Sequence, residues 1–106
     1  MSVVNISDSD FQAVLEKNEP MVIKYFASWC GSCRLIAPKF KRLSENEDYT
    51  GISFYEVDAE NNPEIRKWAG VTNLPFFTVQ NGTERPFSEA TSKLDGLETV
   101  LQSIKK

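Results

Sequence analysis

Apolar and polar positions along this chain follow two periods, one typical of buried strands and the other typical of amphipathic helices. Residues 21–26 are nearly continuous in apolar and β-favouring types, as in a central strand that is covered on both faces. Residues 52–58 predict a second such strand, and residues 76–79 predict a third. The short apolar segment 3–6 adds a strand near the start of the chain.

A hairpin is predicted after the segment 76–79. This segment leads into Asn81-Gly82, a dipeptide that favours tight turns between antiparallel strands, so residues 83–87 are expected to return beside it. Pro86 lacks a backbone N–H and therefore marks the returning segment as an edge strand.

Two helices are predicted in the first half of the chain. Ser7 is expected to cap the first helix, with Asp10 three residues later, and this helix should end near Asn18. The second should begin at the two cysteines and run to about Glu47, because apolar residues recur there at nearly helical spacing. Pro38 lies inside the second helix and predicts a kink.

Two further helices are predicted in the second half. One has Asn62 as its N-cap, Pro63 at its first position and Gly70 as its stop. The other covers residues 92–105, where apolar side chains form one stripe at helical spacing.

The predicted order of elements is β-α-β-α-β-α-β-β-α. Strands that alternate with helices and then form a hairpin indicate an α/β protein with a mixed central sheet and helices on both faces. The chain has 106 residues and shows no internal repeat or long linker, so a single domain over residues 1–106 is expected.

Composition and charge exclude several classes of function. The formal net charge is −3 and the basic residues are scattered, so nucleic-acid binding is not expected, and the densest basic group (Lys39, Lys41 and Arg42) indicates a solvated helix face. No apolar run approaches the ~18 residues of a membrane span, and the first ten residues do not resemble a secretory signal. A cytoplasmic monomer without membrane association is therefore expected.

The two cysteines, Cys30 and Cys33, are the strongest candidates for chemistry. A disulfide across so short a loop would constrain the unfolded chain little, so a purely structural staple is disfavoured. The chain has no histidine and no other cysteine, so one chain alone cannot complete a typical zinc site, and neither a metal nor a cofactor is expected. Two buried small side chains, or a cluster bridging two chains, are the alternatives to a redox pair.

The position of Cys30 indicates a nucleophilic thiolate. It lies where a strand leads into a helix, so unpaired N-terminal amides and the helix dipole favour the ionised sulfur. Cys33 follows within the first helical turn and is expected to resolve the mixed disulfide that Cys30 forms with a target. Gly31 and Ser32 keep the turn small, and Trp29 is expected on the surface beside an exposed nucleophile.

Several segments together resemble the thioredoxin family over nearly the whole chain. These segments are Phe26-Ala27-Ser28-Trp29-Cys30-Gly31-Ser32-Cys33-Arg34, Ala37-Pro38, Val57-Asp58-Ala59-Glu60-Asn61-Asn62-Pro63-Glu64, Leu74-Pro75 and Asn81-Gly82. The resemblance implies a thioredoxin fold and an oxidoreductase that reduces protein disulfides in electron transport and cell redox homeostasis. It implies disulfide-containing proteins as targets and a thioredoxin reductase or a similar reductant as the electron donor.

The resemblance also implies a substrate-binding surface. Pro75 is expected to be a cis proline beside the cysteines, with the backbone near Leu74 pairing with the substrate. An apolar docking surface is expected around Trp29, Val71, Leu74 and the loop near Ala90.

The sequence departs from the family at positions around the cysteines. The family usually has a buried aspartate where this chain has Lys24, and the lysine that pairs with this aspartate corresponds to Phe54. The charge pair is therefore not expected to be simply swapped with its members intact, and a different electrostatic setting is expected. Lys24 either tunes the cysteines by its charge or extends its ammonium into water, and Glu56 is interpreted as a surface charge. Arg34 either adds positive potential near the thiols or is simply solvated.

Further departures leave a second function open. The usual proline between the cysteines is Ser32, and the residue after Pro75 is Phe76 instead of threonine. A partner-specific binding or redox-sensing module with little general reductase activity is therefore the alternative to a disulfide reductase.

Trp68, at helical spacing from Ile65, is expected in the core.

Overall fold

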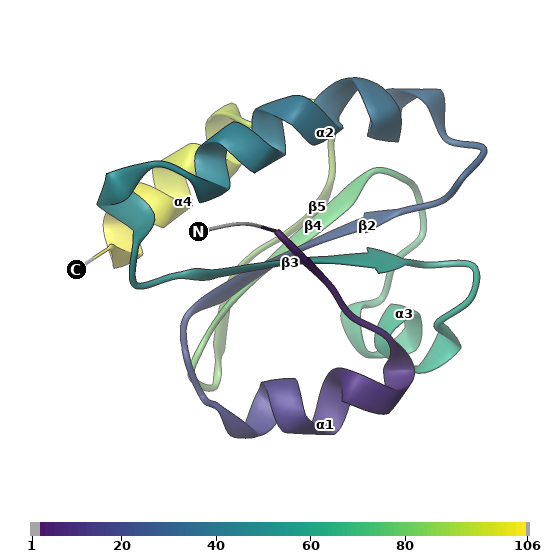
Figure 1. Ribbon diagram of the computed structural model, residues 1–106, viewed down its shortest axis with the longest axis horizontal. Coiled ribbons are helices and arrows are strands. Elements are labelled where there is room, and N and C mark those ends of the chain that lie inside the picture. The colour runs from purple at the N-terminus through teal and green to yellow at the C-terminus, as the bar shows by residue number, and fades with distance from the viewer. Residues whose placement is uncertain (1–2, 106) are drawn as a thin grey trace.

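The computed structural model describes residues 3–105, in which a five-stranded sheet lies between two layers of helices (Figure 1). The strands are β1 (Val4–Asn5), β2 (Met21–Phe26), β3 (Ser53–Asp58), β4 (Phe76–Asn81) and β5 (Glu84–Ala90). The helices are α1 (Asp8–Glu16), α2 (Gly31–Ser44), α3 (Pro63–Ala69), α4 (Asp95–Ile104) and the 3₁₀ turn η1 (Glu47–Tyr49). The predicted order of elements is confirmed.

The sheet is mixed, with the strand order β1-β3-β2-β4-β5. Strands β1 and β2 run parallel to β3, whereas β4 is antiparallel to both β2 and β5. Helices α2 and α4 cover one face and α1 and α3 cover the other (Figure 1). The α/β architecture expected from the sequence is thus confirmed, with β2 as the central strand.

Each face of the sheet has its own apolar core, because successive side chains of a strand point to opposite faces. The α2/α4 core cluster contains Val22, Ile36, Phe40, Leu43, Tyr49, Ile52, Phe54, Phe77, Val79, Phe87, Leu94, Leu97 and Leu101. The α1/α3 core cluster contains Ile6, Val14, Met21, Ile23, Tyr25, Tyr55, Val57, Ala59, Ile65, Ala69, Val71 and Phe76. Strand β2 contributes to both clusters, and its first five residues are buried, as the sequence predicts.

The boundaries of α1 and α2 follow local hydrogen bonds. Ser7 caps α1 as predicted, and its backbone N–H donates to Asp10 Oδ2 at 3.0 Å. Helix α2 ends at Ser44, earlier than the predicted end near Glu47. The side chain of Asn46 accepts a hydrogen bond from the Asp48 N–H at 2.9 Å and so begins η1 instead of extending α2.

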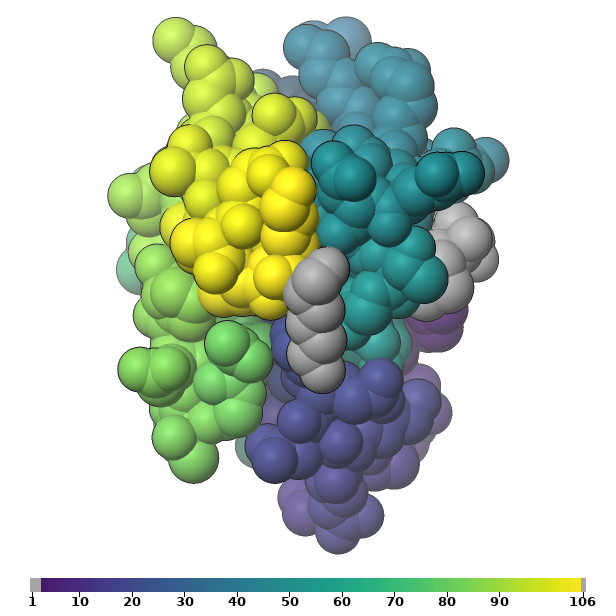
Figure 2. All heavy atoms as spheres, turned by 90° about the vertical axis from the view of Figure 1, so that its left-hand side faces the viewer, coloured from purple at the N-terminus to yellow at the C-terminus, as the bar shows by residue number. Residues whose placement is uncertain are grey.

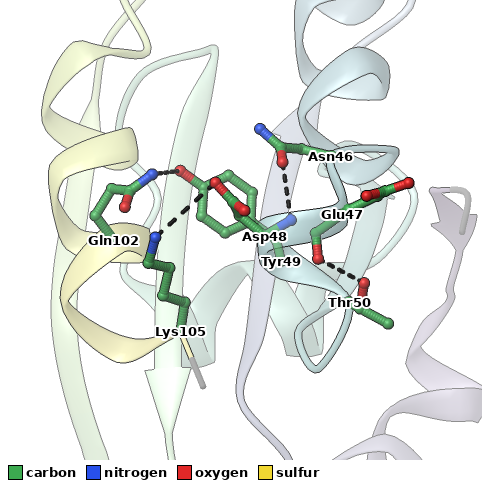
Figure 3. Close-up of polar contacts among 7 residues, drawn as sticks. All are labelled: Asn46, Glu47, Asp48, Tyr49, Thr50, Gln102 and Lys105. Atoms are coloured by element: carbon green, nitrogen blue, oxygen red, sulfur yellow. Dashed lines mark hydrogen bonds and ion pairs between the residues drawn. The ribbon is translucent and has the colours of Figure 1, made fainter.

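The turn η1 joins α2 to α4. The amide of Gln102 donates to the Tyr49 hydroxyl at 2.7 Å, and Lys105 pairs with Asp48 at 3.9 Å (Figure 3). Figure 2 shows α4 beside the C-terminal part of α2 and η1. These segments are far apart along the chain but adjacent in space. Helix α4 begins at Asp95, three residues later than predicted.

The start of α3 is held by α1. Asn62 occupies the predicted N-cap position, but its side chain makes no capping bond. Instead, Asp8 accepts from the backbone N–H groups of Glu64 at 3.1 Å and Ile65 at 2.9 Å, and Asn62 Oδ1 accepts from the Asp8 N–H at 2.8 Å. Gly70 ends α3 in the left-handed conformation with φ +70°, as predicted.

The hairpin of β4 and β5 forms one edge of the sheet, with Gly82 at φ +65° in its turn. Pro86 lies in the edge strand, as predicted. Across residues 3–105, no helix combines the length and the hydropathy that a membrane crossing requires.

Candidate active site

Cys30 lies between β2 and α2, at the N-cap of the helix. Its backbone is extended, with φ −86° and ψ 104°, and its sulfur accepts a hydrogen bond from the Cys33 N–H at 3.1 Å. The first turn of α2 contains no acidic residue that would oppose a negative charge on this sulfur. An unpaired helix amide therefore meets the Cys30 sulfur, which is the environment that favours a thiolate.

Cys30 and Cys33 form a disulfide, and their Cα atoms are 5.2 Å apart. Cys30 is 5% exposed and Cys33 is 3% exposed, so the expectation of an exposed nucleophile is wrong for the oxidised protein. The two sulfurs pack against Ala27, with Phe26 and Leu74 beside them. Only a narrow part of the disulfide is therefore accessible to an attacking thiol.

Trp29 lies on the surface, as predicted, and is 65% exposed. Its indole N–H donates to the carboxylate of Glu60. The backbone N–H of Glu60 in turn donates to Asp58 Oδ1 at 3.0 Å, at the end of β3. The segment after β3 thus holds the indole beside the cysteines, and its part in the site was not predicted from the sequence.

Trp68, expected in the core, is half-buried. Its ring lies against Phe11, with 4.9 Å between the centroids, and packs on the α1/α3 core cluster. The guanidinium of Arg85 lies over this ring at 4.0 Å from its centroid. Trp68 therefore serves packing on the α1/α3 face of the sheet.

A groove runs beside Ser32 along a loop that contains a cis peptide bond. The cis bond is Leu74-Pro75, as the resemblance implies, and the Thr91 N–H donates to the Pro75 carbonyl at 3.0 Å. The groove has a volume of 440 Å³ and is lined by Ser32, Asn73, Leu74, Pro75, Ala90, Thr91, Ser92 and Lys93. Most of these residues are polar, so the groove is less apolar than expected.

Val71 contributes little to the expected docking surface. It is 7% exposed and packs in the α1/α3 core cluster. Leu35 is instead exposed over 80% of its surface and lies one turn after Ser32 on α2. Together with Trp29 it provides apolar surface near the cysteines.

Lys24 is buried and forms a charge pair with Glu56. The two residues are register partners on the parallel strands β2 and β3, and Lys24 Nζ lies 3.6 Å from Glu56 Oε1. The ammonium also lies 5.5 Å from the ring centroid of Phe40 and 5.6 Å from that of Phe26. The Lys24 side chain is 5% exposed, so the alternative in which its ammonium extends into water is wrong.

The expectation that the charge pair of the family is not simply swapped is also wrong. Phe54 is the register partner of Val22, two positions before Glu56 on the same face of β3. The Glu56 side chain is only 30% exposed, so it is not a simple surface charge. Charges of opposite sign therefore meet in this protein with the cation on β2 and the carboxylate on β3.

A second cavity joins this charge pair to Cys33. It has a volume of 260 Å³ and is lined by Lys24, Phe26, Ala27, Ser28, Cys33, Arg34, Ala37 and Glu56. Arg34 is exposed at its mouth and donates from Nη1 to the Ser28 carbonyl at 3.3 Å. Both sequence candidates for electrostatic tuning, Lys24 and Arg34, thus line the same cavity as Cys33.

The described residues contain no group of three or more His, Cys, Asp or Glu side chains arranged to hold a metal ion.

The family model for thioredoxin matches residues 2–103. This chain belongs to the thioredoxin family.

Known thioredoxins resemble this one in sequence and in structure. Thioredoxin-1 of Schizosaccharomyces pombe is 39% identical over 82 residues, which cover 76% of this chain and 78% of that protein. The chloroplastic thioredoxin M4 of Arabidopsis thaliana is 32% identical over 87 residues, which cover 80% of this chain and 44% of that protein. The crystal structure of Schistosoma mansoni thioredoxin superposes with a TM-score of 0.86 at 27% identity, covering 97% of this chain and 95% of that one.

Family membership and the disulfide pair establish the activity. The protein is a thiol:disulfide oxidoreductase with a thioredoxin fold, and it reduces protein disulfides through the reversible pair Cys30-Cys33. Thioredoxins act on disulfide-containing targets and are themselves reduced by thioredoxin reductase.

Proposed function

We propose that Cys30 is the attacking thiol and Cys33 the resolving thiol of this thioredoxin. The Cys30 thiolate attacks one sulfur of a target disulfide, forms a mixed disulfide and releases the other target sulfur as a thiolate. Cys33 then loses its proton and attacks Cys30, which releases the second target sulfur and leaves the Cys30-Cys33 disulfide. Two electrons pass to the target, and an external reductant returns two electrons to the pair.

One observation carries this assignment of roles. The N–H of Cys33 donates to the Cys30 sulfur at the N-terminus of α2, whereas within residues 3–105 no donor makes an equivalent bond to the Cys33 sulfur. The helix therefore stabilises negative charge on Cys30, while Cys33 lies within reach of it. A stabilised thiolate suits the first attack, and a close neighbouring thiol suits the second.

The target chain is proposed to lie between Trp29 and the groove beside Pro75. Gly31 and Ser32 are exposed at the start of α2, and a Cβ at Gly31 would meet no atom within 4 Å. This leaves room for a target backbone next to Leu74. Polar side chains that line the groove support binding of an extended peptide through hydrogen bonds.

We further propose a cytoplasmic monomer that consists of one domain and receives electrons from a thioredoxin reductase. One sheet unites the chain from β1 to β5, and both core clusters share β2, which supports a single domain. In this setting the protein would contribute to electron transport and cell redox homeostasis.

The reduction of insulin disulfides with dithiothreitol tests the proposed roles. We expect the parent protein to accelerate the reaction, Cys30→Ser to abolish the acceleration, and Cys33→Ser to accumulate mixed disulfides at Cys30 that appear by mass spectrometry. Equal rates with and without the parent protein would contradict general reductase activity. Mixed disulfides at Cys33 in Cys30→Ser, formed as fast as those at Cys30, would contradict the assignment of roles.

A further inference from the structure

Three charged residues line the 260 Å³ cavity that Cys33 shares with the charge pair. They are Lys24 on β2, Glu56 on β3 and Arg34 on α2, and the remaining residues around the cavity carry no charge. The cavity is large enough to hold several water molecules. A proton that leaves Cys33 can therefore reach any of these charged groups through water.

The second exchange step needs a proton acceptor near Cys33. A thiol must be ionised before it attacks a disulfide. The ammonium of Lys24 and the guanidinium of Arg34 are donors without acceptor capacity, whereas an ionised carboxylate has only acceptor sites. Glu56 is therefore the one charged group around this cavity that takes up a proton.

We propose that Glu56 is the proton acceptor for Cys33 in the second exchange step. The proton moves from the Cys33 thiol through cavity water to the Glu56 carboxylate, and the Cys33 thiolate attacks the Cys30 sulfur of the mixed disulfide. The bond between Cys30 and the target breaks, and the departing target thiolate takes a proton from water. Glu56 returns its proton to solvent, which its 30% exposed side chain reaches.

Lys24 is a positioning residue in this step. Its ammonium holds Glu56 Oε1 at 3.6 Å, while Asn5 Nδ2 donates to Glu56 Oε2 at 3.5 Å from the other side. The ammonium of Lys24 lines the same cavity as Cys33, so its positive charge faces the thiolate that forms in this step. The pair thus supplies a proton acceptor on β3 and a stabilising cation on β2. In the arrangement expected from the family, the carboxylate lies on β2 instead.

The inference rests on the proposed role of Cys33 and is tested by single-turnover reduction of insulin at several pH values. Acid-quenched samples are analysed by mass spectrometry for the mixed disulfide at Cys30. In Glu56→Gln we expect the second step to slow roughly 10- to 100-fold at pH 7, so that the mixed disulfide accumulates. Its rate should then rise about tenfold per pH unit near neutrality, because only solvent accepts the proton, while the parent profile is flatter.

Matched variants separate this role from a structural one. Glu89→Gln changes an exposed glutamate on the edge strand β5 and should behave like the parent. Glu56→Asp keeps a carboxylate and should recover most of the lost rate. Alkylation of Cys30 by iodoacetamide reports on the first thiol alone and should change less than about twofold in Glu56→Gln.

Two results would overturn the inference, and they are distinguishable. If the parent reduces insulin and Glu56→Gln shows the same rate and pH profile, Glu56 is not the acceptor although the proposed function stands. If the parent itself does not reduce insulin, the proposed function fails first. A loss of fold in Glu56→Gln would appear in its circular dichroism spectrum, and Glu56→Asp then decides the question through its own pH profile.

Discussion

Tyr25 shows how burial at a single residue sets the response of the protein to pH. Its side chain lies inside the α1/α3 core cluster, and its hydroxyl forms a hydrogen bond with Thr78 Oγ1 at 3.0 Å. Burial raises the pKa of Tyr25 to about 12, although the hydrogen bond with Thr78 and the positive charge of Arg85 oppose this rise. The folded protein therefore holds the Tyr25 proton more tightly than the unfolded chain does.

This difference predicts a loss of stability at high pH. Stabilisation by the neutral phenol is complete below pH 10 and is lost as the pH rises towards 12, because only the unfolded chain readily ionises there. Between pH 9 and pH 11 we expect Tyr25 to account for a decrease of about 1 kcal/mol in the free energy of unfolding. Urea unfolding measures this change, and Tyr25→Phe should show a smaller decrease than the parent over the same interval. An equal decrease in both proteins would contradict the assignment.

Residues that act across strands were the hardest part of the site to predict. Cys30 and Cys33 follow from their spacing and from their place at the start of a helix. Glu56 escaped prediction because its role depends on the register of β2 against β3, which places it beside Lys24 and sets Phe54 beside Val22. A single sequence gives the faces of each strand through the period of two, but not the register between strands that are far apart along the chain.

At the scale of elements, the contact between α1 and α3 depends on one side chain. Asp8 lies in the first turn of α1 and accepts two backbone hydrogen bonds from the first turn of α3. A carboxylate at the positive end of a helix adds a favourable electrostatic contribution. Asp8 thus does for α3 what an N-cap side chain usually does within one helix.

Replacing this carboxylate should destabilise the fold measurably. We expect Asp8→Ala to lower the free energy of unfolding by about 1–2 kcal/mol, in the range of a lost helix cap. Asp48→Ala serves as the control, because its ion pair with Lys105 is exposed and should contribute less than about 1 kcal/mol. Guanidinium unfolding measures the free energy of unfolding of both variants. Equal losses would show that the hydrogen bonds from α3 to Asp8 contribute no more than an exposed ion pair.

Local patterns predicted the elements better than they predicted the element boundaries. The period of the apolar residues and the signals at Ser7, Pro63 and Gly70 gave the order and type of every main element. The predicted end of α2 is wrong because the side chain of Asn46 binds the backbone N–H of Asp48 and starts a new turn. The sequence predicts Asn62 as the cap of α3. It does not indicate Asp8, because Asp8 is 54 positions away along the chain and is adjacent only in the folded structure.

At the scale of the whole molecule, we expect the fold not to depend on the disulfide. Both core clusters form without the cysteine sulfurs, which belong to a small separate cluster with Ala27. The disulfide closes a loop of very few residues, so its effect on the entropy of the unfolded chain is small compared with that of a long-range staple. The protein is therefore built to keep its fold in both redox states.

Unfolding of the two redox states checks this expectation. The oxidised protein should be more stable than the reduced protein by about 2 kcal/mol, the value that chain entropy gives for so short a loop. Urea unfolding with and without dithiothreitol measures the difference, and Cys30→Ser should unfold at the same urea concentration under both conditions. Loss of the cooperative unfolding transition after reduction would contradict the expectation that the two core clusters do not depend on the disulfide.

The low exposure of Cys30 and Cys33 has a consequence for which thiols in a cell exchange electrons with this disulfide. Small thiols are abundant, but a disulfide that shows so little of its surface gives them few productive collisions. A large partner that fits around Trp29 and the groove beside Pro75 gains contact area that orients its sulfur. Low exposure of this kind therefore favours partners whose surfaces fit around the disulfide, even where small thiols are more concentrated.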